Sequence, residues 1–306
     1  MTFRLSRRAA IASTLAAPAV LAATRMATAQ TAPQAPSPMP RARGFKVGDF
    51  DVTTLLAGSA MREEPHTIFG LNVDAETFGT VSRDNFIPTD KAQFYFTPTV
   101  VRTASEVILF DTGLNPEGIA TALQEAGTSA DDVTHVVITH MHGDHIGGLM
   151  KDGAPTFANA AYLTGEREYD HWADSGNEGF EGMVKPLAEQ MTFLKDGDSV
   201  TSGITAVAAF GHTPGHMTYM LESGNDQLLL AADLANHYVW SLAYPDWEVK
   251  YDSDKAAAAE SRRRILGMLA ADKVPFVGYH MPFPAAGFVD TREDGFRYVP
   301  VSYQLM

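Results

Sequence analysis

The chain contains no cysteine among its 306 residues. A thiolate nucleophile is therefore excluded, and no disulfide framework can hold the fold together. A chain without cysteine can be exported without forming disulfides, so this absence leaves the cellular compartment open.

Basic residues are also scarce, with 23 Lys and Arg against 37 Asp and Glu and a formal net charge of −14. Such an acidic chain lacks the positive surface that binds phosphate backbones, which excludes nucleic acid as a partner. The expected partner is a neutral, apolar small molecule. A composition of 45% hydrophobic and 20% charged residues is typical of a globular enzyme with a sizeable core. The oligomeric state stays open, a homodimer included.

A long apolar run is missing from the N-terminus. Arginines precede an Ala-rich run at 9–23 that is interrupted by Ser13, Thr14 and Pro18. A membrane span needs about 20 strongly apolar residues, so we expect no stable membrane anchor. The pattern instead predicts a bacterial export signal over residues 1–29, cleaved after a small-x-small site, and a periplasmic or secreted protein.

The arginine pair Arg7-Arg8 resembles a twin-arginine signal, although Ala10 stands where Phe or Leu is usual, so general secretion stays open. Cleavage removes four arginines and no acidic residue, so the charge falls from −14 to −18. Four prolines among small residues then predict a flexible arm over 30–44, followed by a catalytic domain over 45–306.

The most informative stretch is His140 to His145, which reads His-Met-His-Gly-Asp-His directly behind an apolar run. On a helix, residues two apart point about 200° away from each other, whereas at a strand end they point the same way. His140 and His142 can therefore share an ion, while Asp144 and His145 diverge towards a second one. Buried imidazoles and carboxylates without partners cost several kcal/mol, which favours metal binding over simple packing.

Three later strand ends present further metal-type side chains. His216 lies on a Gly-His-Thr-Pro-Gly-His turn, and Asp233 and His280 each follow an apolar run. A lone histidine after a strand is more often a core or surface residue than a ligand. A catalytic metal needs three or more protein ligands, however, and these residues would complete the half-site at 140–145.

These motifs resemble the metallo-β-lactamase superfamily, in order from about residue 46 to the C-terminus. The stretch 138–149, the 211–216 turn and the ending Gly-Phe-Arg-Tyr-Val-Pro-Val-Ser-Tyr at 295–303 are most similar to the methyl parathion hydrolase and quorum-quenching lactonase group. The resemblance implies an α/β fold, an αβ/βα four-layer sandwich with two mixed β-sheets flanked by helices.

The resemblance also implies two divalent metal ions, with Zn²⁺ favoured and Mn, Fe or Co accepting the same ligands. The first ion would be held by His140, His142 and His216. The second would be held by Asp144, His145 and His280, with Asp233 as the bridge. His212 also matches the family turn, where we expect a supporting role outside the ligand set.

The expected reaction is hydrolysis. Hydroxide shared by two ions would attack a lactone, ester or organophosphate ester, with Asp144 or Asp233 relaying a proton. A β-lactamase, an oxygenase or thioesterase on the same fold, and a non-catalytic binding protein are the alternatives. The last is disfavoured because all seven expected ligands are present.

Several elements around these motifs can also be predicted. Alternating segments at 45–56 and 94–110 indicate strands, and 116–126 and 254–271 indicate helices, the latter with a Ser253/Asp254 cap. Asp111 is either a support beneath the metal site or a simple turn residue. The run Arg262-Arg263-Arg264 is interpreted as a solvated helix face rather than an anion site.

Substrate choice is expected to lie in loops over the metals, at 114–119, 169–180 and 235–247. These loops are rich in aromatic residues, which favours an apolar pocket. We expect Trp172, Phe180 and Trp240 to bind substrate.

Export can be tested with a reporter fused behind residues 1–35, which we expect to reach the periplasm. If the signal is of the twin-arginine type, Arg7→Lys combined with Arg8→Lys abolishes periplasmic reporter activity. Export that survives the double change indicates the general secretory route.

Overall fold

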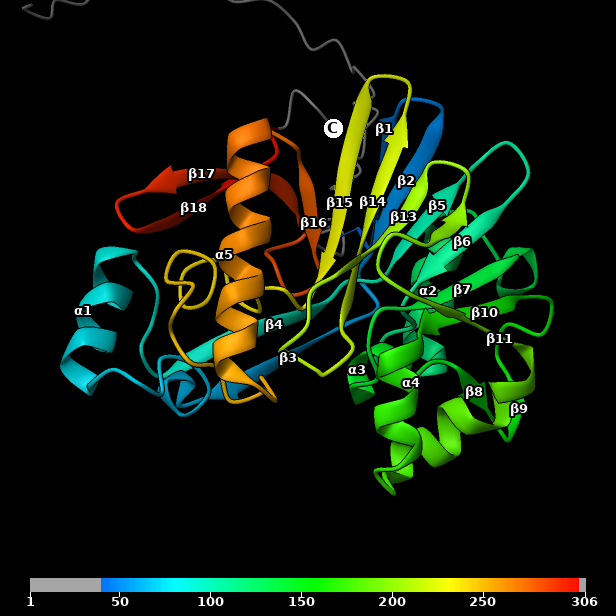
Figure 1. Ribbon diagram of the computed structural model, residues 1–306, viewed down its shortest axis with the longest axis horizontal. Coiled ribbons are helices and arrows are strands. Elements are labelled where there is room, and N and C mark those ends of the chain that lie inside the picture. The colour runs from blue at the N-terminus through cyan, green and yellow to red at the C-terminus, as the bar shows by residue number, and fades with distance from the viewer. Residues whose placement is uncertain (1–39, 303–306) are drawn as a thin grey trace, which may run out of the picture. The chain divides into compact units, whose positions relative to one another are not determined.

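The computed structural model describes residues 40–302, so the predicted signal and residues 30–39 of the predicted arm lie outside the described residues. Within this part of the chain, two seven-stranded sheets pack face to face, and helices cover their outer faces (Figure 1). The four-layer α/β sandwich predicted from the sequence is confirmed. No helix in residues 40–302 combines the length and apolar character needed to cross a membrane.

The first sheet has the strand order β1-β2-β5-β6-β7-β10-β11. Its strands are β1 (Ala42–Val47), β2 (Phe50–Leu55), β5 (Thr99–Arg102), β6 (Val107–Phe110), β7 (His135–Ile138), β10 (Ala161–Gly165) and β11 (Met191–Leu194). The predicted strands at 45–56 and 94–110 are present. The first begins earlier than the predicted domain boundary at 45, because Arg43 and Gly44 already pair with β2.

The second sheet runs in chain order from β12 to β18. Its strands are β12 (Ser199–Thr201), β13 (Ile204–Ala208), β14 (Met217–Ser223), β15 (Asp226–Ala232), β16 (Phe276–Gly278), β17 (Ala286–Arg292) and β18 (Gly295–Pro300). Two short ribbons stand apart from the sheets. They are β3 (Gly58–Glu63) with β4 (Lys91–Phe96), and β8 (Met150–Lys151) with β9 (Ala154–Pro155).

Within residues 40–302, five α-helices connect these strands. They are α1 (Ala75–Asp84), α2 (Pro116–Glu125), α3 (Gly143–Ile146), α4 (Glu166–Ala173) and α5 (Lys255–Asp272), with short 3₁₀ or π turns at 65–67, 130–132, 180–184 and 185–190. The helices predicted at 116–126 and 254–271 are confirmed. As predicted, Asp254 caps α5, its side chain accepting the backbone N–H of Ala257 at 3.0 Å.

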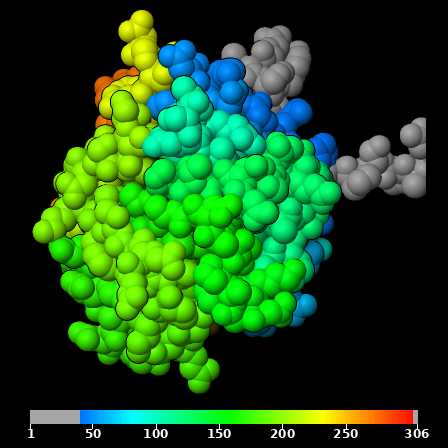
Figure 2. All heavy atoms as spheres, turned by 90° about the vertical axis from the view of Figure 1, so that its right-hand side faces the viewer, coloured from blue at the N-terminus to red at the C-terminus, as the bar shows by residue number. Residues whose placement is uncertain are grey.

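Alternation along the first sheet separates two cores. Val101 and Val137 face the second sheet and share a core with residues of α5, whereas their neighbours Val100 and Val136 pack with residues of α2. Successive strand residues point to opposite faces, which explains why these runs are apolar throughout. Figure 2 looks onto the outer side of the first sheet, which is covered by chain from the middle of the sequence, coloured green.

The α5 layer can be tested through Leu266, whose side chain is fully buried in the core shared with both sheets. Leu266→Ala is expected to lower the free energy of unfolding by about 2–5 kcal/mol, because apolar contacts are lost and a cavity remains. Denaturant unfolding measures this value. Phe86→Ala is the control, since that side chain is 97% exposed, and its change is expected to stay within about 0.5 kcal/mol. Equal changes in both variants would contradict the assignment.

Candidate metal centre

Four loops at strand ends meet at one edge of the sandwich. The stretch 140–145 follows β7, the turn 211–216 lies between β13 and β14, and Asp233 and His280 follow β15 and β16. Their side chains form two groups in which the potential ligand atoms lie within 4.8 Å of one another. Group 1 is His140, His142, His212 and Asp233, and group 2 is Asp144, His145 and His280.

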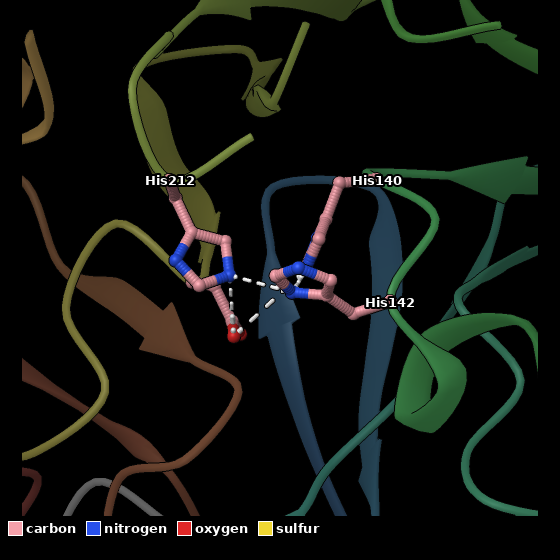
Figure 3. A group of neighbouring side chains, drawn as sticks. His140, His142 and His212 are labelled. Carbon is pink, nitrogen blue, oxygen red and sulfur yellow. Dashed lines mark hydrogen bonds and ion pairs between the residues drawn. The ribbon is translucent and has the colours of Figure 1, made fainter. Parts of the chain in front are cut away.

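The group 1 histidines point their ring nitrogens towards one another, with His212 approaching from the side opposite His140 and His142 (Figure 3). Nδ1 of His142 lies 3.1 Å from Nε2 of His140 and 3.0 Å from Nε2 of His212. Nε2 of His212 is also 3.3 Å from Oδ2 of Asp233. Three imidazole nitrogens and one carboxylate oxygen therefore surround a common point.

Asp233 also faces group 2. Its Oδ1 lies 3.2 Å from Nε2 of His145, and its Oδ2 lies 3.2 Å from Nε2 of His280. Asp144 completes this group, with Oδ2 at 3.4 Å from Nε2 of His280. The structure thus places the Asp233 carboxylate between the two groups, in the position that the predicted bridging role requires.

Hydrogen bonds on the far side of each ring assign the imidazole tautomers. Nδ1 of His145 faces Oδ2 of Asp111 at 2.8 Å, Nδ1 of His212 faces Oδ1 of Asp252 at 2.9 Å, and Nδ1 of His280 faces a backbone carbonyl at 2.8 Å. Carboxylates and carbonyls only accept, so the proton is assigned to Nδ1 in all three rings. Each Nε2 then directs a lone pair into the cluster, which is the usual arrangement of metal-binding histidine.

His140 reaches the same state through a hydroxyl group. The Thr139 hydroxyl donates to Oδ2 of Asp111 at 2.8 Å, so its oxygen accepts from Nδ1 of His140 at 3.1 Å. Asp111 adopts a left-handed backbone with φ 61° and also accepts the backbone N–H of Thr139. Of the two roles considered for Asp111, the structure therefore shows the support beneath the site.

The residues present fit a divalent cation. Nε2 of His145 and Oδ1 of Asp233 are buried and have no hydrogen-bond partner among the described residues. Lone pairs that face one another cannot hydrogen-bond, and buried unsatisfied polar atoms are costly. A cation coordinated by these atoms removes the cost, and a set of imidazoles and carboxylates suits zinc-type ions. The cluster is a divalent metal site by the chemistry of its donors.

Charge at the cluster supports the same conclusion. Burial, followed by the electrostatic interaction with His145, holds the pKa of His140 well below its usual range, and burial with His212 lowers the pKa of His142 to about 3. Burial acts on His212 too, but its hydrogen bonds to Asp233 and Asp252 outweigh burial and raise its pKa to about 9. The carboxylates favour a positive charge in the cluster, whereas burial disfavours protonation of His140 and His142. A metal cation supplies the positive charge without protonating these rings.

The structure corrects one predicted ligand: His212, not His216, joins the cluster. Both ring nitrogens of His216 form hydrogen bonds within the protein. Nδ1 donates to the carbonyl of Ala209 and Nε2 accepts the backbone N–H of Asp233, each at 3.1 Å. No lone pair is left for a metal. The prediction of His216 as a ligand is wrong, and its role is to support the backbone of Asp233. The other six predicted ligands lie in the two groups.

Glu168 of α4 was not identified from the sequence. Its buried carboxylate accepts the backbone N–H of Met141 at 3.0 Å and of Gly215 at 2.9 Å. It also accepts the Thr213 hydroxyl at 2.7 Å and the Trp172 indole at 2.6 Å. The close approach requires glycine, because a Cβ on Gly215 would lie 2.1 Å from the backbone nitrogen of Glu168. Glu168 therefore joins the two loops that carry the group 1 histidines.

The prediction that the arginines at 262–264 form a solvated helix face is wrong for Arg262. This side chain is 1% exposed, and its Nη1 donates to Oδ2 of Asp252 at 2.8 Å. The other oxygen of Asp252 accepts from His212, so a buried Arg262–Asp252–His212 chain leads to the cluster. The next residue, Arg263, does remain at the surface, paired with Asp246.

A cavity of about 350 Å³ opens beside the metal-binding groups. Its lining residues outside the metal-binding loops are Arg62, Phe94, Phe96, Leu114 and Tyr251. Leu114 belongs to one of the three predicted loops, while the two phenylalanines lie on β4. A larger cavity of about 730 Å³ contains none of the ligand residues, so the smaller one is the candidate substrate site.

The prediction that Trp172, Phe180 and Trp240 bind substrate is wrong, since none of the three lines this cavity. Phe180 and Trp240 are 1% exposed and belong to separate cores, and the indole of Trp240 donates to Ser82 at 3.0 Å. Trp172 donates to Glu168 and lies edge-on to His142, with 6.0 Å between the ring centroids. Trp172 therefore contacts a metal-binding ring without facing the substrate site.

Comparison with known proteins gives concordant matches. Residues 97–276 match the metallo-beta-lactamase superfamily. A probable metallo-hydrolase, YybB, of Bacillus subtilis is 31% identical over 142 residues, 44% of this chain and 59% of the relative. An N-acyl homoserine lactonase of Bacillus cereus is 28% identical over 113 residues, 37% of this chain and 42% of the relative. The chain thus spans only about half the length of these two relatives.

Among solved structures, the chain is similar to AidC, a dizinc quorum-quenching lactonase in complex with a product. The TM-score is 0.79 at 27% identity, and the match covers 86% of this chain and 98% of that one.

The Arg262–Asp252–His212 chain can be tested with Asp252→Asn. Losing the buried charge weakens the hold on Nδ1 of His212 and leaves Arg262 without its partner, so metal affinity is expected to fall about 10- to 100-fold. Chelator competition with metal analysis measures this change. Asp246→Asn is the matched control, because it removes the exposed carboxylate that pairs with Arg263. Unchanged metal affinity in Asp252→Asn would show that this chain does not support the site.

Proposed function

The chain belongs to the metallo-β-lactamase superfamily, and from this we propose that it is a binuclear metal-dependent hydrolase of lactones and other carboxylic esters. The observation that carries the proposal is the pair of ligand groups meeting at Asp233. A metal-dependent hydrolase is supported by the family match and by the lactonase relatives. The presence of two ions and the preference for esters are proposed here in addition to the metal-dependent hydrolase activity.

In this proposal His140, His142 and His212 hold one ion, and the three residues of group 2 hold the other. The Asp233 carboxylate, which faces both groups, would be available to either ion. We propose zinc, because neutral imidazoles and carboxylates are its common ligands, although manganese, iron and cobalt accept the same donors.

Bound divalent ions supply an activated water and a Lewis acid for the substrate carbonyl. The protein orients these elements through the assigned tautomers and provides carboxylates for proton transfer. The side chain of Asp144 is 23% exposed and lines the cavity, whereas that of Asp233 is 3% exposed. Asp144 is therefore the carboxylate better placed to pass a proton to a departing alkoxide. The Tyr279 hydroxyl fixes this loop by donating to the carbonyl of Asp144 at 2.5 Å.

The wall of the cavity favours an apolar ester. Phe94 and Phe96 stand edge-on to the ring of His280, with 5.3 and 5.6 Å between centroids. A substrate whose carbonyl reaches the metal-binding groups places its ring or acyl chain against these side chains and Leu114, where burial of apolar area favours binding.

We expect the purified protein to bind two divalent ions per chain and to lose its activity to chelators. His212→Ala lowers the metal content because a ligand is lost. His216→Gln retains both ions because its amide oxygen can still accept the N–H of Asp233. Elemental analysis is combined with assays on γ- and δ-lactones, aryl esters, phosphotriesters and a chromogenic β-lactam.

One ion per chain at full activity would rule out the binuclear mechanism. Cleavage of the β-lactam alone would reassign the substrate class. Retention of both ions in His212→Ala, with loss in His216→Gln, would restore the ligand set first expected from the sequence.

A further inference from the structure

The β3–β4 ribbon forms one wall of the metal cavity and carries a cation at its far end. In its antiparallel register Gly58 pairs with Phe96, Ala60 with Phe94, and Arg62 with Ala92. Directly paired residues share one face of a ribbon, as do residues two apart. One face therefore presents small and aromatic residues beside the metal-binding groups and then Arg62.

The spacing along this face can be estimated from strand geometry. Each step of two residues advances about 7 Å, so the backbone of Arg62 lies about 7 Å beyond the Ala60–Phe94 pair. At the near end, Phe94 and Phe96 both contact His280 edge-on. A substrate lying along the face thus meets the metals first, then an aromatic surface, and finally a guanidinium group.

Arg62 is available to a ligand. Its side chain is exposed and lines the cavity, and it makes no hydrogen bond or ion pair with any residue in 40–302. By contrast, Arg262 and Arg263 have carboxylate partners. Among the described residues that line this cavity, Arg62 is the only lysine or arginine. Tyr251, 37% exposed, lines the same cavity.

We propose that Arg62 is a specificity-determining residue that binds a carboxylate at the distal end of the substrate, which makes carboxylate-bearing esters or lactones the preferred substrates. This inference rests on the proposed hydrolase function. A guanidinium group matches a carboxylate with two parallel hydrogen bonds, and adjoining apolar side chains strengthen the attraction by excluding water. A free cation in this cavity also offsets the repulsion that a chain of net charge −14 exerts on anions. The spacer between carboxylate and scissile carbonyl is about one aromatic ring long.

The test uses two substrates of nearly the same shape, 4-acetoxybenzoate and its neutral analogue 4-acetoxybenzamide. Arg62→Met keeps an unbranched apolar stem but removes the guanidinium group and its charge. This variant is expected to raise KM for the benzoate about 10- to 100-fold, as expected for a lost charge-assisted hydrogen bond, with little change for the benzamide. Arg62→Lys retains part of the preference. Lys91→Met is the matched control, because it removes a cation from the same ribbon that does not line this cavity.

Binding is measured as well as turnover, by calorimetry with the products 4-hydroxybenzoate and 4-hydroxybenzamide. Weaker binding of the benzoate alone in Arg62→Met, with unchanged metal content, supports the proposal even if the ester is a poor substrate. Equal effects on both compounds, or no preference in the unaltered protein, would overturn it. Loss of the proposed hydrolase function gives a different result, in which no ester or lactone is cleaved by the metal-loaded protein whatever residue stands at 62.

Discussion

The site depends first on one buried carboxylate, that of Glu168. It accepts hydrogen bonds from both metal-binding loops, through Met141 on one side and Thr213 and Gly215 on the other. A charge in this position is stable only while its donors remain in place, because a buried carboxylate without partners is costly. The same interaction therefore fixes the distance between the loops and penalises their separation. The group 1 histidines approach one another because α4 holds their loops together from beneath.

A second set of hydrogen-bond acceptors determines which nitrogen of each imidazole ring is free to coordinate a metal. Asp111, Asp252 and a backbone carbonyl each accept a hydrogen bond from the Nδ1–H of a ring, so the Nε2 lone pairs of the three rings point into the cluster. These hydrogen bonds orient the imidazoles through contacts within the protein, which favours coordination of a metal ion. Asp252 is itself oriented by Arg262, which extends the support from the cluster into α5. Asp111 and Asp252 therefore serve the site by orienting the imidazole rings, and not by contributing ligand atoms.

The features that could be predicted from the sequence depend on residues close together in the chain. The spacing of His140, His142 and Asp144 after a strand determines where these side chains point, and that prediction holds. The choice between His212 and His216 was not local, because it depends on contacts with residues far along the chain, Asp252 for one ring and Asp233 for the other. The burial of Arg262 has the same cause, since its partner lies in a loop and not on its own helix. The wall of the cavity was not predicted because β4 pairs with β3 in a ribbon outside the two main sheets. In the sequence, its phenylalanines have the alternating pattern of any strand that packs in a core.

The two ligand groups draw on both halves of the sandwich. One loop follows a strand of the first sheet, and the others lie at the ends of strands of the second, with 70 residues separating His142 from His212. An ion held by both loops acts as a cross-link that closes this length of chain, much as a disulfide does. In a protein without cysteine, such a link is insensitive to the redox state of the surroundings. Its strength follows the free concentration of the metal instead, so that resistance to unfolding and proteolysis becomes a function of metal supply.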